Sequence, residues 1–89
     1  MIQTIASAVP LQRTTFRGEI VSLDIGETPW VRTDAVLSDG TGTLVLRFVG
    51  RRSIPGLDVG RGVVVEGTPG REGDALVMVN PLYSFDGVG

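Results

Sequence analysis

A short polar segment between two apolar runs constrains the fold of this chain more than any other stretch. The segment, residues 38–43, reads Ser-Asp-Gly-Thr-Gly-Thr, and alternating runs precede it at residues 30–37 and follow it at residues 44–49. Asp-Gly between such runs is the strongest short-range β-hairpin signal, because glycine accepts a positive φ without steric cost. A two-residue loop at the centre of the segment sets Asp34 directly opposite Arg47.

Alternation assigns the side chains of this hairpin to two faces. The face expected to be buried carries Thr33, Ala35, Leu37, Leu44, Leu46 and Phe48, and the outer face carries Arg32, Asp34, Val36, Val45, Arg47 and Val49. Residues 13–25 read as the strand before the hairpin, with Phe16 in the core and Gly18 at a bend, a bulge or a close backbone approach. The same register arithmetic across the turn at residues 26–29 places Glu19 opposite Asp34.

The remainder of the chain supplies two further strands and their connections. Residues 62–67 and 75–79 read as strands, residues 68–74 as an exposed hairpin loop, and residues 82–85 as a short edge segment. Residues 50–60 are too apolar for a free loop, so we expect Ile54 and Leu57 to plug one end of the core. Residues 1–12 form either an extended strap or a short helical turn ending near Pro10, and residues 86–89 form a flexible tail.

Five strands with long connections predict one all-β domain, a closed five-stranded Greek-key barrel of the OB-fold type spanning residues 13–85. The chain of 89 residues contains no cysteine and no histidine, and all eight of its basic residues are arginine. That arginine usage reflects either genomic base composition or selection for planar, bidentate contacts. Without histidine, cysteine or lysine the usual nucleophiles and bases are missing, so we expect no enzyme activity, no metal and no cofactor.

Charge and hydropathy also narrow the expected partners. The net charge is −2, so the chain lacks the overall basic character of many nucleic-acid-binding domains. No apolar run approaches the length of about 18 residues that a membrane span needs. The first residues lack the basic flank and apolar run of a secretory signal, so the expected location is the cytoplasm and the membrane is not an expected partner.

Four motifs resemble those of the actinobacterial small OB-fold proteins described as nucleic-acid-binding-domain proteins. They are Phe-Arg-Gly-Glu-Ile at residues 16–20, Leu-Ser-Asp-Gly-Thr-Gly at 37–42, Gly-Arg-Arg-Ser-Ile-Pro-Gly at 50–56 and Asn-Pro-Leu-Tyr at 80–83. The Asp-Gly-Thr-Gly hairpin occurs in many OB domains, whereas the run after the third strand and the Asn-Pro-Leu-Tyr motif are more specific. The resemblance covers most of the chain and implies an OB-fold and binding of nucleic acid.

The candidate binding residues lie on and beside the outer face of the second and third strands. OB domains bind single strands there, through aromatic side chains and basic residues. Trp30 is placed to stack a base or, alternatively, to cap the end of the barrel. Arg32 and Arg47 either meet phosphates, together with Arg17, or belong to an ion-pair network with Asp34. Asn80 is expected to be a buried amide that fixes the turn before Pro81.

Arg51 and Arg52 are the strongest candidates for phosphate contacts, because the nearest acid in the sequence is Asp58. The leading expectation is weak, sequence-tolerant binding of single-stranded DNA or RNA with a steep dependence on salt. The alternative is a module for protein interaction or assembly, with a protein partner or a second copy bound to the outer face or to a strand edge. Val36, Val45, Val49 and Val64 would then form the apolar surface.

Overall fold

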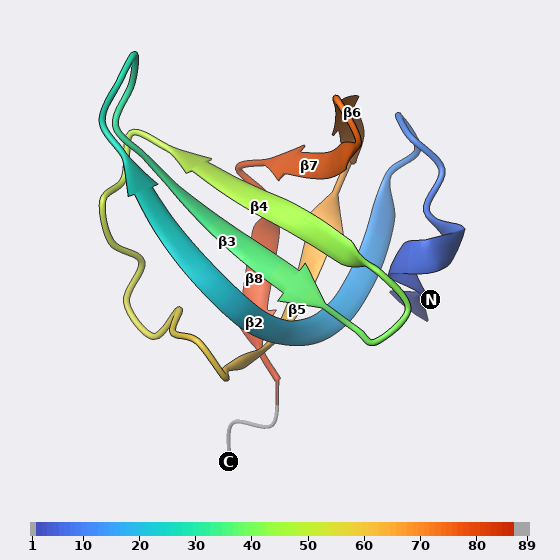
Figure 1. Cartoon of the computed structure of the whole chain (residues 1–89). Coiled ribbons are helices and arrows are strands. Elements are labelled where there is room, and N and C mark those ends of the chain that lie inside the picture. The colour runs from blue at the N-terminus through green and yellow to red at the C-terminus, as the bar shows by residue number, and fades with distance from the viewer. Residues whose placement is uncertain (1, 87–89) are drawn as a thin grey trace.

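The computed structural model describes residues 2–86, and these residues form an eight-stranded mixed sheet with one short 3₁₀ turn (Figure 1). None of the described residues lies in an α-helix. Within the same range, no helix has the length and hydropathy needed to cross a membrane. The elements are β1 (Ile2–Gln3), η1 (Ile5–Ser7), β2 (Thr14–Gly26), β3 (Arg32–Ser38), β4 (Thr43–Val49), β5 (Gly62–Gly67), β6 (Gly70–Glu72), β7 (Ala75–Val79) and β8 (Leu82–Phe85).

The long strand β2 connects the parts of the sheet. The strand order is β6-β7-β4-β3-β2-β5-β8, and β1 pairs with β2 outside this path. β4 and β7 run parallel, as do β1 and β2, whereas the other neighbours are antiparallel. The sheet curls strongly, but β6 and β8 remain as its two ends (Figure 1). The described strands therefore form an open sheet, and the predicted closed barrel is not confirmed.

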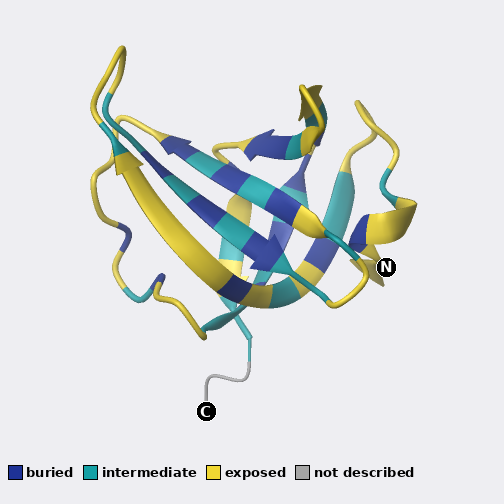
Figure 2. Cartoon of the chain, in the orientation of Figure 1, coloured by how far each residue is buried: buried dark blue, intermediate teal, exposed yellow. Residues whose placement is uncertain are grey.

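The hairpin of β3 and β4 has the predicted register. Asp34 pairs with Arg47 and Ala35 with Leu46. The turn between the strands contains Gly40 at φ +85°, a conformation that glycine adopts without strain. The six side chains assigned to its inner face are all buried, and both faces alternate along each strand (Figure 2).

The register between β2 and β3 differs from the predicted one. Asp24 lies opposite Asp34, and Glu19 lies opposite Ser38. The predicted turn at residues 26–29 begins too early, because Gly26 remains in the strand and pairs with Arg32. A β-carbon on Gly26 would lie 3.1 Å from the guanidinium carbon of Arg32, so the glycine leaves room for that side chain. A register shift between Ile20 and Ser22 changes the pairing again toward the first half of the strand.

The core lies between the inner faces of the curled sheet, and each end of it is covered by a connecting segment. Ile54 and Leu57 of the long connection are buried, as predicted, and Ile5 of η1 is buried on the hairpin side. Gly18 is a site of close backbone approach, because a β-carbon there would lie 2.5 Å from the carbonyl oxygen of Ser38. The largest fully buried side chains are Phe16, Ile20, Leu37, Leu44, Leu46 and Met78, and Phe48 packs with them at 3% exposure.

Three segments differ from their predicted form. The loop expected at residues 68–74 contains β6, which pairs with β7, and its Pro69 is fully buried. The first 12 residues combine both predicted forms, an extended β1 and the turn η1. Asp86, expected in a flexible tail, donates its backbone N–H to the Gly62 carbonyl over 2.8 Å, and residues 87–89 of that predicted tail lie outside the described range.

Candidate functional site

The loop between β2 and β3 and the segment after β4 meet at one end of the sheet (Figure 1). The backbone N–H of Gly50 donates to the Val31 carbonyl over 2.7 Å. The buried hydroxyl of Thr33 donates to the Arg51 carbonyl over 2.7 Å. Arg52 pairs with Glu27 across the two segments. These contacts hold the predicted binding residues on fixed backbone beside β3 and β4.

Trp30 lies beside a shallow depression at this end of the outer face. The depression has a volume of about 440 Å³, and its remaining lining residues are Pro29, Arg32, Arg47, Val49 and Glu72. Trp30 is 66% exposed, so it does not cap the end of the core. An exposed indole beside a hollow with apolar and charged walls is a surface on which a planar group can stack.

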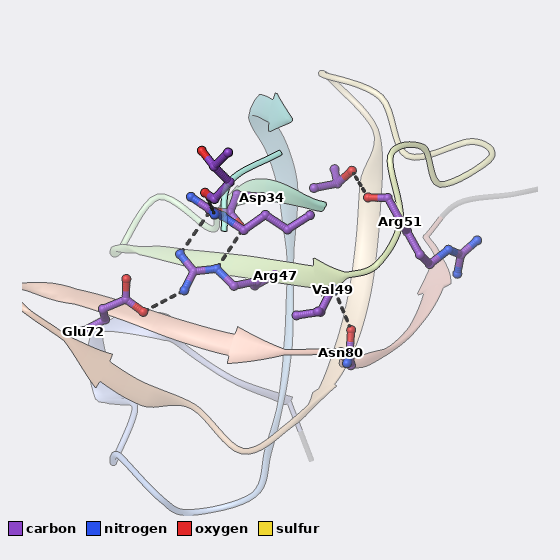
Figure 3. A network of polar contacts seen from close by, with 9 residues as sticks. Asp34, Arg47, Val49, Arg51, Glu72 and Asn80 are labelled. Carbon is purple, nitrogen blue, oxygen red and sulfur yellow. Dashed lines mark hydrogen bonds and ion pairs between the residues drawn. The ribbon is translucent and has the colours of Figure 1, made fainter. Parts of the chain in front are cut away.

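The arginine and carboxylate side chains of the outer face form an ion-pair network (Figure 3). Arg47 donates through Nε to Asp34 Oδ1 over 3.0 Å and through Nη2 to Asp34 Oδ2 over 3.1 Å. Its Nη1 donates to Glu72 over 2.7 Å. These hydrogen bonds, from Asp34 first and then Glu72, raise the pKa of Arg47. Each of its three guanidinium nitrogens therefore already donates to a carboxylate, and of its five N–H groups one on Nη1 and one on Nη2 remain.

Arg32 belongs to the same network but is held less well. Its Nε lies 3.5 Å from Asp34 Oδ2 and is buried without a hydrogen-bond partner, while its Nη1 donates to the Thr28 carbonyl over 3.2 Å. The predicted network of Asp34 and Arg47 is thus present and extends to Arg32 and Glu72. Its two arginines and two carboxylates cancel in charge. Arg17, also proposed for this face, pairs with Asp86 near the C-terminal end of the described chain.

Arg51 and Arg52 differ in their surroundings, although both were predicted as equally strong candidates for phosphate contacts. Arg52 contacts Glu27, so the expectation that it lacks a nearby acid is wrong. Arg51 is exposed, its guanidinium points away from the network of Arg47, and it forms no ion pair within residues 2–86 (Figure 3). Arg51 is therefore the predicted arginine with most of its hydrogen-bonding capacity available.

Two residues at this end of the sheet have roles that the sequence did not identify or described differently. Asn80 fixes the turn as expected, accepting a hydrogen bond from the Val49 N–H at its side-chain oxygen over 3.0 Å, but the residue is exposed rather than buried. Glu72 reaches Arg47 because β7 pairs in parallel with β4 and carries β6 with it. No local pattern around Glu72 indicates this non-local pairing.

Comparison of the sequence with known proteins finds no matching family model and no matching curated protein.

Proposed function

We propose that this chain is a partly open Greek-key module of the OB type that binds single-stranded nucleic acid weakly, through the surface around Trp30. The strand order β5-β2-β3-β4 supports the fold assignment, because a Greek key places its fourth strand beside its first. β3 and β4 then correspond to the second and third strands of an OB domain, whose outer face and adjoining loops bind oligonucleotides. The motifs that resemble those of actinobacterial small OB-fold proteins point in the same direction.

The exposed indole of Trp30 beside the depression carries the proposal. A base stacks on Trp30 at the end of β3 and β4, and Arg51 contacts the adjoining phosphate. Arg52 contributes when it leaves Glu27, whereas Arg32 and Arg47 remain in their network and shape the hollow. Stacking on an aromatic ring is tolerant of sequence because every base offers a planar face.

The neutralised network changes the expected salt dependence from steep to shallow. Each phosphate neutralised on a single strand contributes a slope of about −0.7 to the plot of log K against log salt. With only Arg51 and Arg52 available, we expect a total slope no steeper than about −1.4. Affinity then depends mainly on stacking, which is consistent with a net charge of −2.

Trp30 is the only tryptophan of the chain, so its fluorescence reports directly on the proposed site. Titration with oligo-dT and with a mixed-sequence RNA at about 50 mM salt is expected to quench this emission and to raise the anisotropy of a labelled strand. Trp30→Ala is expected to weaken binding at least about fivefold, since stacking contributes about 1–3 kcal/mol per base. Arg51→Ala weakens binding, and Arg13→Ala, which removes the same charge at the other end of β2, leaves it unchanged.

Absence of binding at several hundred micromolar protein would overturn this function. Equal effects of Arg51→Ala and Arg13→Ala would show that general charge, rather than this surface, attracts the strand. A second function, the docking of a polypeptide at a strand edge, is favoured by the exposed apolar side chains of β2 and has its own site.

A further inference from the structure

The second half of β2 is paired on one side only. Residues 14–19 pair with β5 on one side, and the following residues pair with β3 on the other. From Ser22 to Gly26 the side that faced β5 has no strand neighbour among residues 2–86. The apolar side chains of this half are well exposed, with Leu23 at 39% and Ile25 at 55% (Figure 2). Long exposed apolar edges are where another chain adds to a sheet.

The hydrogen-bond alternation of the sheet shows which backbone groups face this open side. Each residue of an antiparallel strand directs its N–H and C=O to one neighbour, and successive residues alternate. The Gly50 N–H donates to the Val31 carbonyl in the same register that pairs β3 with β4. The odd-numbered residues of β3 therefore direct their backbone N–H and C=O groups toward β4. Its even-numbered residues therefore bond to Ser22, Asp24 and Gly26 of β2.

Leu23 and Ile25 consequently direct their N–H and C=O groups outward, away from β3. The preceding outward-facing residue, Ile20, is already satisfied, because it donates to Arg61 over 3.0 Å and accepts from Gly60 over 2.7 Å. The open edge thus begins where the connection to β5 leaves β2, and it offers two donors and two acceptors in register for an added strand.

The side chains along this edge differ between the two faces. On the inner face, Leu23 and Ile25 line a cavity of about 170 Å³ with Thr33 and with five residues of the connection after β4, the apolar Ile54 and Leu57 and the polar Arg52, Ser53 and Asp58. On the outer face, Asp24 lies opposite Asp34 and forms no ion pair within the described range. Asp34 is held by two arginines, whereas Asp24 has no cation. The strand edge therefore carries apolar side chains on its inner face and a carboxylate without an ion-pair partner in the described range on its outer face.

We propose that residues 22–26 of β2 dock an extended polypeptide in which apolar and basic residues alternate. The peptide adds as a strand at Leu23 and Ile25, its apolar side chains enter the cavity, and a lysine or arginine lies opposite Asp24. In antiparallel addition Asp24 occupies a non-hydrogen-bonded position, where opposed side chains are closest. A second copy of β2 fits less well, because pairing centred on Leu23 places Ser22 opposite Asp24 and supplies no cation.

The test uses a labelled nine-residue peptide in which valine alternates with lysine, and a control peptide with glutamate in place of lysine. Anisotropy is expected to show binding of the lysine peptide and weaker binding of the glutamate peptide. Asp24→Lys is expected to reverse this preference, with a change of about two- to fivefold for each charge pair. The variant leaves the backbone groups of the edge unchanged.

Two further measurements locate the bound peptide. Its addition is expected to slow amide hydrogen exchange at Leu23 and Ile25, whose N–H groups face the open side, while Ser22, Asp24 and Gly26 change little. Ile25→Pro removes one outward donor and no bond to β3, so it is expected to abolish binding while the amide spectrum of the rest of the sheet persists. Ile25→Thr keeps the donor and retains the exchange pattern with weaker binding.

Three results would overturn the proposal. The first is the absence of binding at about 1 mM peptide. The second is slowed exchange at the exposed edge strand β8 in place of β2. The third is protection of the Leu23 and Ile25 amides from exchange that increases with protein concentration in the absence of peptide. That result would assign the edge to a second copy of the chain.

Discussion

At the scale of single residues, the surroundings of each arginine decide whether it can act as a binding group. Arg47 and Arg51 lie close in sequence on and after the same strand, yet Arg47 is paired with two carboxylates, whereas Arg51 is exposed and forms no ion pair within residues 2–86. An arginine whose donors are already used stabilises the fold more than it attracts a ligand. The charge pattern of the sequence alone does not separate these two cases.

The network of Arg47 is expected to contribute measurably to stability, because Asp34 is only 16% exposed. Arg47→Leu leaves this carboxylate with Arg32 alone at 3.5 Å. We expect a loss of about 1–3 kcal/mol in the free energy of unfolding, measured by urea denaturation. Arg13→Ala breaks the exposed pair with Glu66 and is expected to change stability by less than about 0.5 kcal/mol. Equal losses for the two variants would contradict this assignment.

Two glycines without positive φ provide a second comparison at this scale. Gly18→Ala forces a β-carbon to within 2.5 Å of a backbone oxygen, so the strand must move. We expect a loss of about 2 kcal/mol or more, as for other overpacked positions. Gly70→Ala meets its nearest atom at 4.0 Å and is expected to be nearly neutral. Thermal unfolding of both variants measures the difference between the two stability losses. Equal losses would show that β2 can move away from Ser38 without a cost in stability.

At the scale of elements, the turn between β3 and β4 also anchors the N-terminal segment. Asp39 accepts hydrogen bonds from the Thr41 hydroxyl over 2.6 Å and from the backbone N–H of Ile5 over 2.8 Å. The Thr41 hydroxyl also accepts a bond from the Ala6 N–H over 3.0 Å. The turn therefore holds η1 over one end of the core, although the sequence marks Asp39 only as a turn residue.

Acid is expected to weaken this anchor. Burial raises the pKa of Asp39, but the hydrogen bonds from Thr41, Ile5 and Gly42 outweigh it and hold the pKa below its ordinary value of 3.8. Because the folded pKa is the lower one, the stabilisation is complete above about pH 5 and is lost as the pH falls through the folded value. Asp39→Asn is expected to cost about 1 kcal/mol at pH 7. Urea denaturation should show this difference shrinking as the pH falls from about 5 through the folded pKa of Asp39, and a difference independent of pH would contradict it.

The sequence predicted most of the fold through local patterns and missed the pairings between distant segments. Alternation and the Asp-Gly turn placed β3 and β4 in the correct register, and short apolar runs located β5, β7 and β8. The partner of Glu72 required the parallel pairing of β4 with β7, which no local pattern specifies. The error at Gly26 arose because a glycine that makes room for a neighbouring side chain resembles one that forms a turn.

For the candidate site, the sequence predicted where the residues lie better than which of them have free hydrogen-bond donors. Trp30, Arg32 and Arg47 line one depression, in agreement with their predicted common location. Which arginines retain free donors depended on acids from distant elements, such as Glu27 and Glu72. The outward backbone groups of Leu23 and Ile25 were likewise not predictable, because they follow from where β5 stops pairing with β2.

At the scale of the whole molecule, the mixed pairing of the sheet has a kinetic consequence. β3 and β4 meet through a short turn, whereas Phe16 pairs with Val65 and Val45 with Val77. Distant contacts form only after the intervening loop has closed, and loop closure costs conformational entropy before those contacts stabilise the chain. Domains rich in such contacts therefore fold in about milliseconds to seconds. We expect the hairpin to form in the rate-limiting step and β7 to dock after it. Gly40→Ala, which strains the turn at φ +85°, is then expected to slow folding.

Val77→Ala, in a buried position of β7, is expected mainly to accelerate unfolding. Stopped-flow measurements in urea separate the folding and unfolding rates. If Val77→Ala slowed folding and Gly40→Ala accelerated unfolding instead, the pairing of β4 with β7 would form before the hairpin. In any transient state that precedes the docking of β7, Val45, Leu46 and Arg47 leave this edge of β4 unpaired. An unpaired strand edge can pair with another chain, so the lifetime of that transient state is expected to govern aggregation during refolding more than the stability of the native sheet does.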